Sequence, residues 1–264
     1  MTKKNTVSTL NQMKSSGEKI ACLTSYDASF TKLQEEVGID VLLVGDSLGM
    51  VLHGDDITRN VTMDDMIYHT RLVNNVRQRA ILICDMPYQS YTSPEHAVEN
   101  AKRLVNEAGA DLVKLEGGEE VSDIIAAIKE SGISVCGHIG LTPQSFDNSK
   151  GFKVQATTQE TAEKLKQDAI AVTQAGCDCV VIECVPADVA SEITQTLEIP
   201  TIGIGAGVDC DGQVLVLHDM LGITGKKFRF LKNFLEDNDS IADAIKAYVT
   251  EVKNKSFPAT EHFF

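Results

Sequence analysis

The residues best suited to chemistry in this chain stand at the ends of short apolar runs. The run 41–44 is followed at once by Gly45, Asp46 and Ser47. Apolar runs bounded by glycine and polar residues are typical of strands buried on both faces. In parallel α/β proteins, ligands bind at the carboxyl ends of such strands. Asp46 is therefore a candidate active-site residue, although an aspartate in this place can also cap the turn that leaves the strand.

Charged or titratable side chains also close the next four apolar runs. They are Asp85 after 81–84, Lys114 and Glu116 in 112–116, His138 in 134–139 and Glu183 in 179–184. Lys114 and Glu116 are two residues apart, so both point to the same side of a strand. Burial of such charges is costly unless they are paired or bind a cation. Capping does not explain so many charged strand ends, which favours a shared site at one rim.

Three carboxylates on neighbouring strands, without a cluster of histidine or cysteine, favour a hard cation. Magnesium fits Asp46, Asp85 and Glu116 best, because it takes few carboxylates and leaves positions for substrate oxygens. An α-keto acid could chelate such an ion, which would stabilise its enolate. Lys114 could then pair with the substrate carboxylate, and Glu183, farther around the rim, suits general acid–base work. The alternative is a buried network of Lys114 and carboxylates that only orders the barrel.

The histidines are weaker candidates for the active site than the carboxylates and Lys114. His138 is equally compatible with a role in the site and with that of a hydrogen-bonded core residue, and His218 has a weaker claim of the same kind. The remaining histidines fall in expected loops, helices or the tail and are interpreted as non-catalytic: His53, His69, His96 and His262.

Strands that could carry these residues alternate with helices along the chain. Apolar runs predict strands at 20–24, 41–44, 81–84, 112–116, 134–139, 179–184, 201–205 and 213–217, the last of which could also be a short helix. Helical spacing and capping residues predict helices at 7–15, 29–37, 62–77, 93–108, 119–130, 159–174, 186–197 and 240–254. Long loops are expected at 48–61 and 141–157.

This alternation, at roughly 30-residue spacing, predicts a (β/α)8 TIM barrel rather than an open doubly wound sheet. The stretch 7–15 precedes the first strand and is expected to be an extra N-terminal helix at one end of the barrel. No linker rich in glycine, proline or serine interrupts the chain, so residues 1–264 are expected to form a single domain.

Charge and composition narrow the range of partners. The chain has 24 basic and 38 acidic residues, a net charge of -14. This balance argues against nucleic acid and against an anionic membrane surface, both of which need a basic face. A small anionic ligand held by one lysine or a metal ion stays compatible with it.

The cysteines and the N-terminus bear on the compartment. The seven cysteines are an odd number without a CxxC pair, so neither a disulfide framework nor a structural zinc site is indicated. Most lie in or beside apolar runs, as small core residues of a reducing compartment do. The first residues are polar, and no apolar run approaches the roughly 20 residues of a membrane span. A cytoplasmic protein is expected.

Several motifs resemble those of the ketopantoate hydroxymethyltransferase family. They are TSYD from Thr24, VGDSLGM from Val44, VKLEGG from Val113, VCGHIGLTPQS from Val135, IECVP from Ile182 and IGIGAG from Ile202. The resemblance covers about residues 21–234. It implies a barrel of the phosphoenolpyruvate/pyruvate type. It also implies transfer of a hydroxymethyl group from 5,10-methylenetetrahydrofolate to 3-methyl-2-oxobutanoate through a Mg-bound enolate. The product would be 2-dehydropantoate (ketopantoate), a precursor of pantothenate and coenzyme A.

The resemblance also assigns roles to residues. Asp46 and Asp85 would bind Mg2+, with Glu116 beside the ion through water. The keto acid would contact Asp46, Ser47, Asp85 and Lys114, and Glu183 would be the proton acceptor. A homodecamer is implied. The chain departs from the family pattern at 151–157, in an expected lid loop, and at 226–230.

Two other functions are compatible with the same residues. A C–C lyase or phosphomutase on the same barrel would act on another α-keto acid without folate. A non-catalytic ligand-binding barrel would bind a keto acid without exchanging its C3 proton. Dependence on tetrahydrofolate and exchange of that proton would separate the three.

Overall fold

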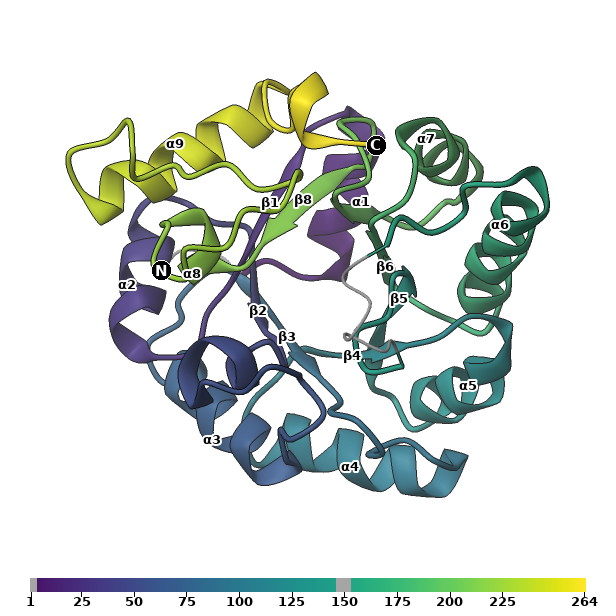
Figure 1. Cartoon of the computed structure of the whole chain (residues 1–264). Coiled ribbons are helices and arrows are strands. Elements are labelled where there is room, and N and C mark those ends of the chain that lie inside the picture. The colour runs from purple at the N-terminus through teal and green to yellow at the C-terminus, as the bar shows by residue number, and fades with distance from the viewer. Residues whose placement is uncertain (1–3, 146–152) are drawn as a thin grey trace.

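Eight short apolar segments form the sheet in the computed structural model, which describes residues 4–145 and 153–264. The strands are β1 (Ile20–Thr24), β2 (Val41–Val44), β3 (Ile81–Asp85), β4 (Leu112–Glu116), β5 (Ser134–Gly140), β6 (Cys179–Glu183), β7 (Thr201–Ile204) and β8 (Gly212–Leu215). Each strand pairs in parallel with the next, and β8 pairs with β1, so the sheet closes on itself. The predicted (β/α)8 barrel is confirmed (Figure 1).

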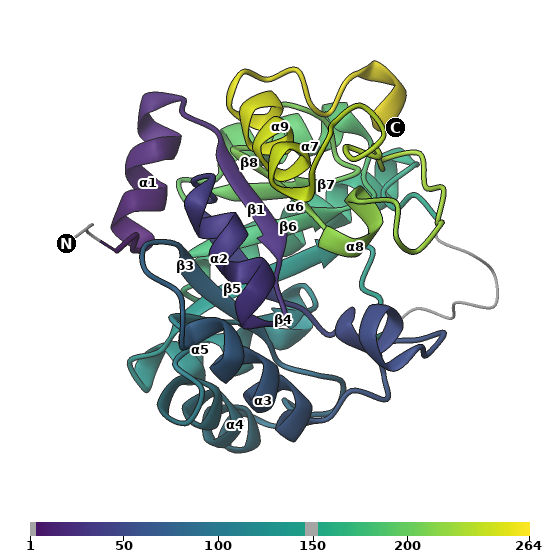
Figure 2. The ribbon, with the colours of Figure 1, turned by 90° about the vertical axis from the view of Figure 1, so that its left-hand side faces the viewer.

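Helices surround this barrel, as Figure 1 shows. The longer ones are α1 (Val7–Ser16), α2 (Ala28–Glu36), α3 (Met63–Asn74), α4 (Pro94–Asn106), α5 (Ser122–Glu130), α6 (Gln159–Gln174), α7 (Ala187–Thr196) and α9 (Ile241–Lys253). Shorter turns are η1 (Gly49–His53), η2 (Glu119–Val121), α8 (Leu217–Met220) and η4 (Thr260–His262). The predicted extra helix α1 lies at the opposite end of the molecule from α8 (Figure 2). Within the described residues, no helix is both long and apolar enough to cross a membrane.

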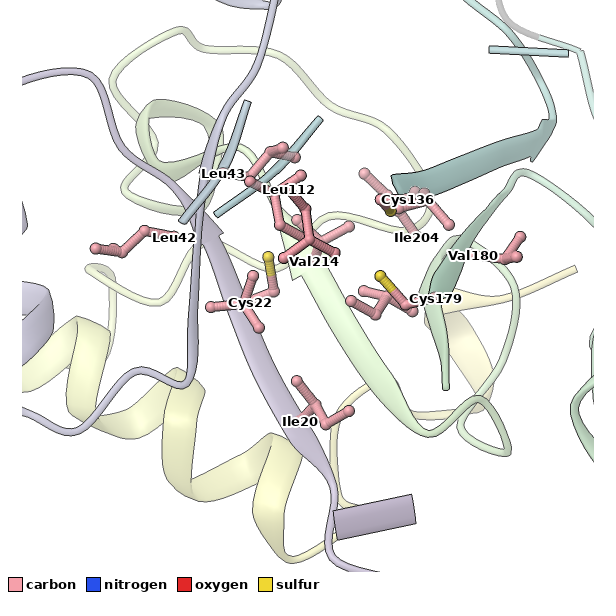
Figure 3. Packing of buried hydrophobic residues seen from close by; sticks show 14 of the residues in the cluster. Ile20, Cys22, Leu42, Leu43, Leu112, Cys136, Cys179, Val180, Ile204 and Val214 are labelled. Atoms are coloured by element: carbon pink, nitrogen blue, oxygen red, sulfur yellow. The ribbon is translucent and has the colours of Figure 1, made fainter. Parts of the chain in front are cut away.

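The inside of the barrel is packed with side chains from alternate strand positions. Cys22, Leu43, Leu112, Cys136 and Cys179 gather there (Figure 3). The neighbouring positions point the other way, as the labelled Leu42 and Val180 show. This alternation follows from the two-residue repeat of a strand. It means that residues two positions farther along these strands, at the carboxyl end, also face the barrel interior.

Several segments differ from the sequence prediction. Residues 119–121 of the expected helix 119–130 form the 3-10 turn η2, and the expected helix 62–77 ends at Asn74. The expected loop 48–61 contains the π-helical turn η1, which ends at Gly54 with a φ of 83°. The expected strand 213–217 ends at Leu215, because the Leu217 amide donates to Oγ1 of Thr24 instead of continuing the strand ladder. The following residues form α8. Of the expected loop 141–157, residues 146–152 lie outside the described part of the chain, and so does part of the departure expected at 151–157.

Candidate active site

The polar residues predicted at the strand ends line one cavity at the carboxyl end of the barrel. Its walls include the site residues named from the sequence, which are Asp46, Ser47, Asp85, Lys114, Glu116, His138 and Glu183. Strand register explains how they meet, because Asp85 of β3 is opposite Lys114 of β4, and Glu116 of β4 is opposite His138 of β5. The side chains that were predicted to share a rim are therefore brought together.

Lys114 and Asp85 form a buried ion pair. Nζ of Lys114 lies 3.0 Å from Oδ1 of Asp85, and both residues are less than 5% exposed. Burial by itself lowers the pKa of Lys114, but the carboxylates of Asp85, Glu116 and Asp46 outweigh burial and raise the pKa above its usual range. The lysine is therefore a permanent cation in the cavity.

The turn after β2 closes tightly against Asp85. The Asp46 amide donates to Oδ2 of Asp85 at 3.0 Å. A Cβ at position 45 would lie 2.9 Å from Oγ of Ser47 and 3.5 Å from Oδ2 of Asp85, so this turn needs glycine. Ser47 is held in turn by the buried Tyr26, whose hydroxyl shares a 2.8 Å hydrogen bond with Oγ of Ser47.

Gln144 joins two of the carboxylates. Its Nε2 donates to Oδ2 of Asp46 at 2.8 Å and to the Met86 carbonyl at 3.0 Å, while its backbone amide donates to Oε2 of Glu116 at 3.0 Å. The Tyr91 hydroxyl donates to Oε1 of Gln144 at 2.5 Å. Gln144 is 1% exposed. Neither Gln144 nor Tyr26 was predicted as a site residue, because neither is a charged residue at a strand end, although both lie inside the family motifs VCGHIGLTPQS and TSYD.

His138 stands between the two halves of the polar wall. Its Nδ1 lies 3.2 Å from Nζ of Lys114 and 3.5 Å from Oε1 of Glu116, and its Nε2 lies 3.0 Å from Oε2 of Glu183. Burial and Lys114 lower the pKa of His138, but Glu116 and Glu183 outweigh them and raise it to about 9. Of the two readings that the sequence left open for His138, its contacts favour membership of the site.

Asp46 shows that the cavity carries an excess of negative charge. Burial raises the pKa of Asp46 well above its usual range, the carboxylates of Asp85 and Glu116 add to the rise, and Lys114 and Gln144 offset it only in part. The carboxylates share one lysine, and Oδ1 of Asp85 accepts no hydrogen bond of good geometry despite its contact with Lys114. A bound cation would relieve this imbalance.

The donor set fits a hard cation held by few protein ligands. Within the described residues, no three histidine, cysteine, aspartate or glutamate side chains form a ready metal cluster. Magnesium does not require one, because it commonly takes one or two carboxylates and keeps several waters. Asp46 and Asp85 satisfy that need. Glu116 already accepts the Gln144 amide and lies near His138, which suits contact through water better than direct coordination.

His218, His69 and the cysteines lie away from the cavity. His218 packs its ring against Tyr26 and Phe30, with centroids 5.6 and 5.7 Å apart, and burial lowers its pKa. His69 contacts the Tyr26 carbonyl through Nδ1 at 2.8 Å. The seven cysteines are free and buried, and none lines the cavity. Nothing in these contacts favours a catalytic cysteine.

Solved structures identify the class of the fold. The chain is similar to phosphoenolpyruvate phosphomutase from Streptomyces platensis subsp. rosaceus, with a TM-score of 0.63, 14% identity and coverage of 97% of this chain and 100% of that one. It is also similar to 2,3-dimethylmalate lyase, a PEP mutase/isocitrate lyase superfamily member, with a TM-score of 0.59, 14% identity and coverage of 96% and 98%. The protein thus shares the (β/α)8 barrel fold of these enzymes and carries a polar site at its strand ends.

Sequence relatives identify the family. The ketopantoate hydroxymethyltransferase family model matches residues 4–260. A 3-methyl-2-oxobutanoate hydroxymethyltransferase from Marinobacter nauticus is 51% identical over 98% of this chain and 98% of its own length. One from Shewanella oneidensis is 52% identical over 99% of both chains. The chain belongs to the ketopantoate hydroxymethyltransferase family, and it is an enzyme of the hydroxymethyltransferase class. The resemblance drawn from the motifs is confirmed.

Proposed function

We propose that this enzyme transfers a hydroxymethyl group from 5,10-methylenetetrahydrofolate to 3-methyl-2-oxobutanoate, giving ketopantoate for pantothenate and coenzyme A synthesis. One observation carries the proposal: a buried lysine and three carboxylates share a cavity with the more accessible Glu183, whose side chain is 13% exposed. Such a cavity suits a small keto acid anion that arrives with a divalent cation. The acceptor is the one that the relatives' names give.

The carboxylates would hold Mg2+, with Asp46 and Asp85 as ligands and Glu116 acting through water. When bound, the ion would supply Lewis acidity toward the keto and carboxylate oxygens of the acceptor. One solved structure of the same fold, a phosphonopyruvate hydrolase, was obtained in complex with oxalate and Mg++.

The acceptor would be oriented by groups of this chain. Lys114 offers a permanent positive charge to an acceptor oxygen, and its position is maintained by Asp85 at 3.0 Å. Ser47 offers a hydroxyl whose direction is set by Tyr26. Asp46 and Asp85 border the same space. Such preorganised groups lower the cost of bringing the reacting carbon to the donor.

Glu183 would accept the C3 proton of the acceptor. The electrons of that C–H bond become the C2–C3 double bond of an enolate. Water adds to the methylene carbon of the iminium form of the donor, and the C–N bond breaks as the folate nitrogen keeps the electron pair and takes a proton. C3 attacks the one-carbon carbonyl so formed, which makes the C–C bond, and the proton held by Glu183 goes to the new alkoxide oxygen. His138 lies 3.0 Å from Oε2 of Glu183 and acts here as a positioning residue.

Exchange of the C3 proton tests the stepwise chemistry. Incubation of the acceptor with enzyme and Mg2+ in D2O, without folate, should place deuterium at C3. Absence of exchange beside normal turnover with folate would remove the separate enolate step. Cleavage of a keto acid without any folate would instead support the lyase or phosphomutase alternative.

Assembly and location extend the proposal. We propose a homodecamer, as the family resemblance implies. Seven buried free cysteines support a reducing compartment, and we place the enzyme in the cytoplasm on that ground.

A further inference from the structure

The catalytic cavity has two unlike walls. One wall carries the polar residues described above. The opposite wall is apolar and aromatic and includes Lys226, Phe228, Phe230 and Leu231, which we call the 226–231 wall. Met50 and Val51 of η1 also border the cavity. The keto and carboxylate oxygens of a short keto acid need only the polar wall, which leaves the aromatic residues of the second wall without an assigned ligand.

The aromatic side chains of the 226–231 wall are built into the barrel end. The rings of Phe228 and Phe230 stack with centroids 5.3 Å apart and planes 12° apart. Phe230 packs on Gly205, where a Cβ would lie 3.1 Å from the ring and where φ is +61°. This contact explains one glycine of the IGIGAG motif. Both phenylalanines are half-buried at a cavity that must admit ligands. Aromatic faces in such a place favour a flat, conjugated ligand.

The same segment is basic in an acidic protein. Residues 226–232 read KKFRFLK, with four cations and no acidic residue, whereas the whole chain has a net charge of -14. Lys232 pairs with Glu251. Nζ of Lys226 lies 6.0 Å from the centroid of the Phe228 ring, and neither Lys226 nor Lys227 has an acidic ion-pair partner among the residues that the structure describes. Lys226 borders the cavity, and Lys227 is exposed beside it. Unpaired cations at the rim favour a ligand with an anionic end.

We propose that the 226–231 wall, with Lys227, is the binding site for the one-carbon donor. The conjugated rings of the donor lie against Phe228 and Phe230, and its carboxylate tail lies near Lys226 and Lys227. The polar wall and this wall then present the acceptor carbon and the donor methylene to each other across one cavity. This inference rests on the proposed function, because it assumes a folate donor.

The test compares donors that differ in tail charge. Turnover is measured with monoglutamyl and with polyglutamyl 5,10-methylenetetrahydrofolate for the natural enzyme, for the double variant Lys226→Ala/Lys227→Ala and for Phe230→Leu. Lys102→Ala, an exposed lysine on α4, is the matched control. Donor-free exchange of the acceptor C3 proton in D2O reports on the polar wall alone, and circular dichroism confirms folding of each variant.

The expected result separates the two walls. The double lysine variant should raise the KM for the polyglutamyl donor about five- to tenfold, with a smaller rise for the monoglutamyl donor, because two ion-pair contacts are lost. Phe230→Leu should raise the KM for both donors alike. The KM for the acceptor and the rate of C3 exchange should stay unchanged in all variants.

Two results would overturn the inference. Unchanged donor KM values in folded variants would show that the wall only covers the cavity. If the KM for the acceptor rose as much as the KM for the donor, and C3 exchange became slower, the 226–231 wall would be a binding site for the acceptor instead. The proposed function is tested separately by the natural enzyme. If the natural enzyme turns over with neither folate donor, the proposed function is wrong, and this inference is wrong with it.

Discussion

At the scale of single residues, Asp46 illustrates the conflict between binding and stability. Its side chain is buried beside Asp85 and Glu116, with Lys114 as a shared cation. Burial, with the repulsion of the Asp85 and Glu116 carboxylates, raises the pKa of Asp46, so the ionised form is unfavourable in the fold and a bound cation would relieve it. A protein with such a site is less stable without its ligand, and binding of the ligand raises the free energy of unfolding.

The variant Asp46→Asn should therefore be more stable than the natural enzyme in EDTA, by on the order of 1 kcal/mol or more. The amide has nearly the same shape and can still accept the Gln144 hydrogen bond. The same variant should lose the rise in thermal midpoint that Mg2+ gives the natural enzyme, together with turnover. Thermal unfolding with EDTA and with Mg2+ checks both effects.

Asp237→Asn, at an exposed position, is the control and should keep the Mg2+ effect. An Asp46→Asn protein that still gains stability with Mg2+, and shows unchanged Mg2+ binding by calorimetry, would exclude Asp46 as a ligand.

His138 provides a second test at this scale. The variant His138→Asn removes the group that lies 3.0 Å from Glu183 and 3.2 Å from Lys114. We expect kcat and the rate of C3 exchange to fall about ten- to hundredfold, because Glu183 loses its fixed orientation, while the KM for the acceptor changes little. Steady-state kinetics and exchange in D2O measure the two effects.

His96→Asn on α4 serves as the comparison, since the imidazole of this histidine contacts the Thr92 and Asn100 side chains and does not line the cavity. A His138→Asn enzyme with natural kcat and natural exchange would assign His138 to the core rather than to the site.

At the scale of elements, the segments after the strands orient the site more than the strands do. The turn after β2 carries Asp46 and Ser47, η1 brings Met50 and Val51 to the cavity, and the segment after β5 supplies Gln144. The chain then leaves η1 and enters α3, which starts with a capping box between Thr62 and Asp65.

Asp65→Asn should weaken this helix start. Asp65 accepts the Thr62 amide at 2.9 Å and the Thr62 hydroxyl at 2.6 Å. Partial burial opposes the shift, but these hydrogen bonds outweigh it and lower the pKa of Asp65 below its ordinary value. Removal of such a cap costs about 1 kcal/mol. Urea unfolding at neutral pH measures the loss in the free energy of unfolding.

The pH dependence follows from the direction of that shift. A carboxyl whose pKa is lowered by folding stabilises the protein above its unfolded pKa, and the contribution disappears as the pH falls through the folded pKa. The difference in the free energy of unfolding between the natural enzyme and Asp65→Asn should therefore become smaller as the pH falls toward about 3. The neighbouring exposed Asp64→Asn, which loses only a surface pair with Arg103, should show a much smaller difference at neutral pH. If the two proteins differed in the free energy of unfolding by the same amount at neutral pH and near pH 3, the capping explanation would be contradicted.

At the scale of the whole molecule, charge works against the assembly that we propose. Each chain of 28.6 kDa carries a net charge of -14, so copies of the chain repel one another at long range. Salt screens this repulsion over about 8 Å at physiological ionic strength. Analytical ultracentrifugation should find a species of about ten chain masses near 150 mM salt, and partial dissociation at low salt and low protein concentration. A monomer or dimer under the first condition would contradict the decamer.

The barrel and the residues of its polar wall could be predicted from the sequence. Strands buried on both faces need continuous apolar runs, so a charge at a strand end, as at Asp85 or Glu183, is conspicuous. Parallel strands place all such ends on one side. The eighth strand was less certain because the apolar run 213–217 continues from β8 into α8, and the Leu217 amide pairs with Thr24, a partner that is distant in the sequence.

The amino-acid sequence by itself determined the barrel, the family and the set of charged residues at the rim, because all three depend on local pattern and motif. Only the tertiary structure decided how those charges share partners. It made Lys114 the common cation, placed His138 against Glu183, brought Gln144 and Tyr26 behind Asp46 and Ser47, and set the 226–231 wall across from them. These contacts join residues far apart in the chain, and their geometry depends on strand register and loop packing, which no local spacing encodes.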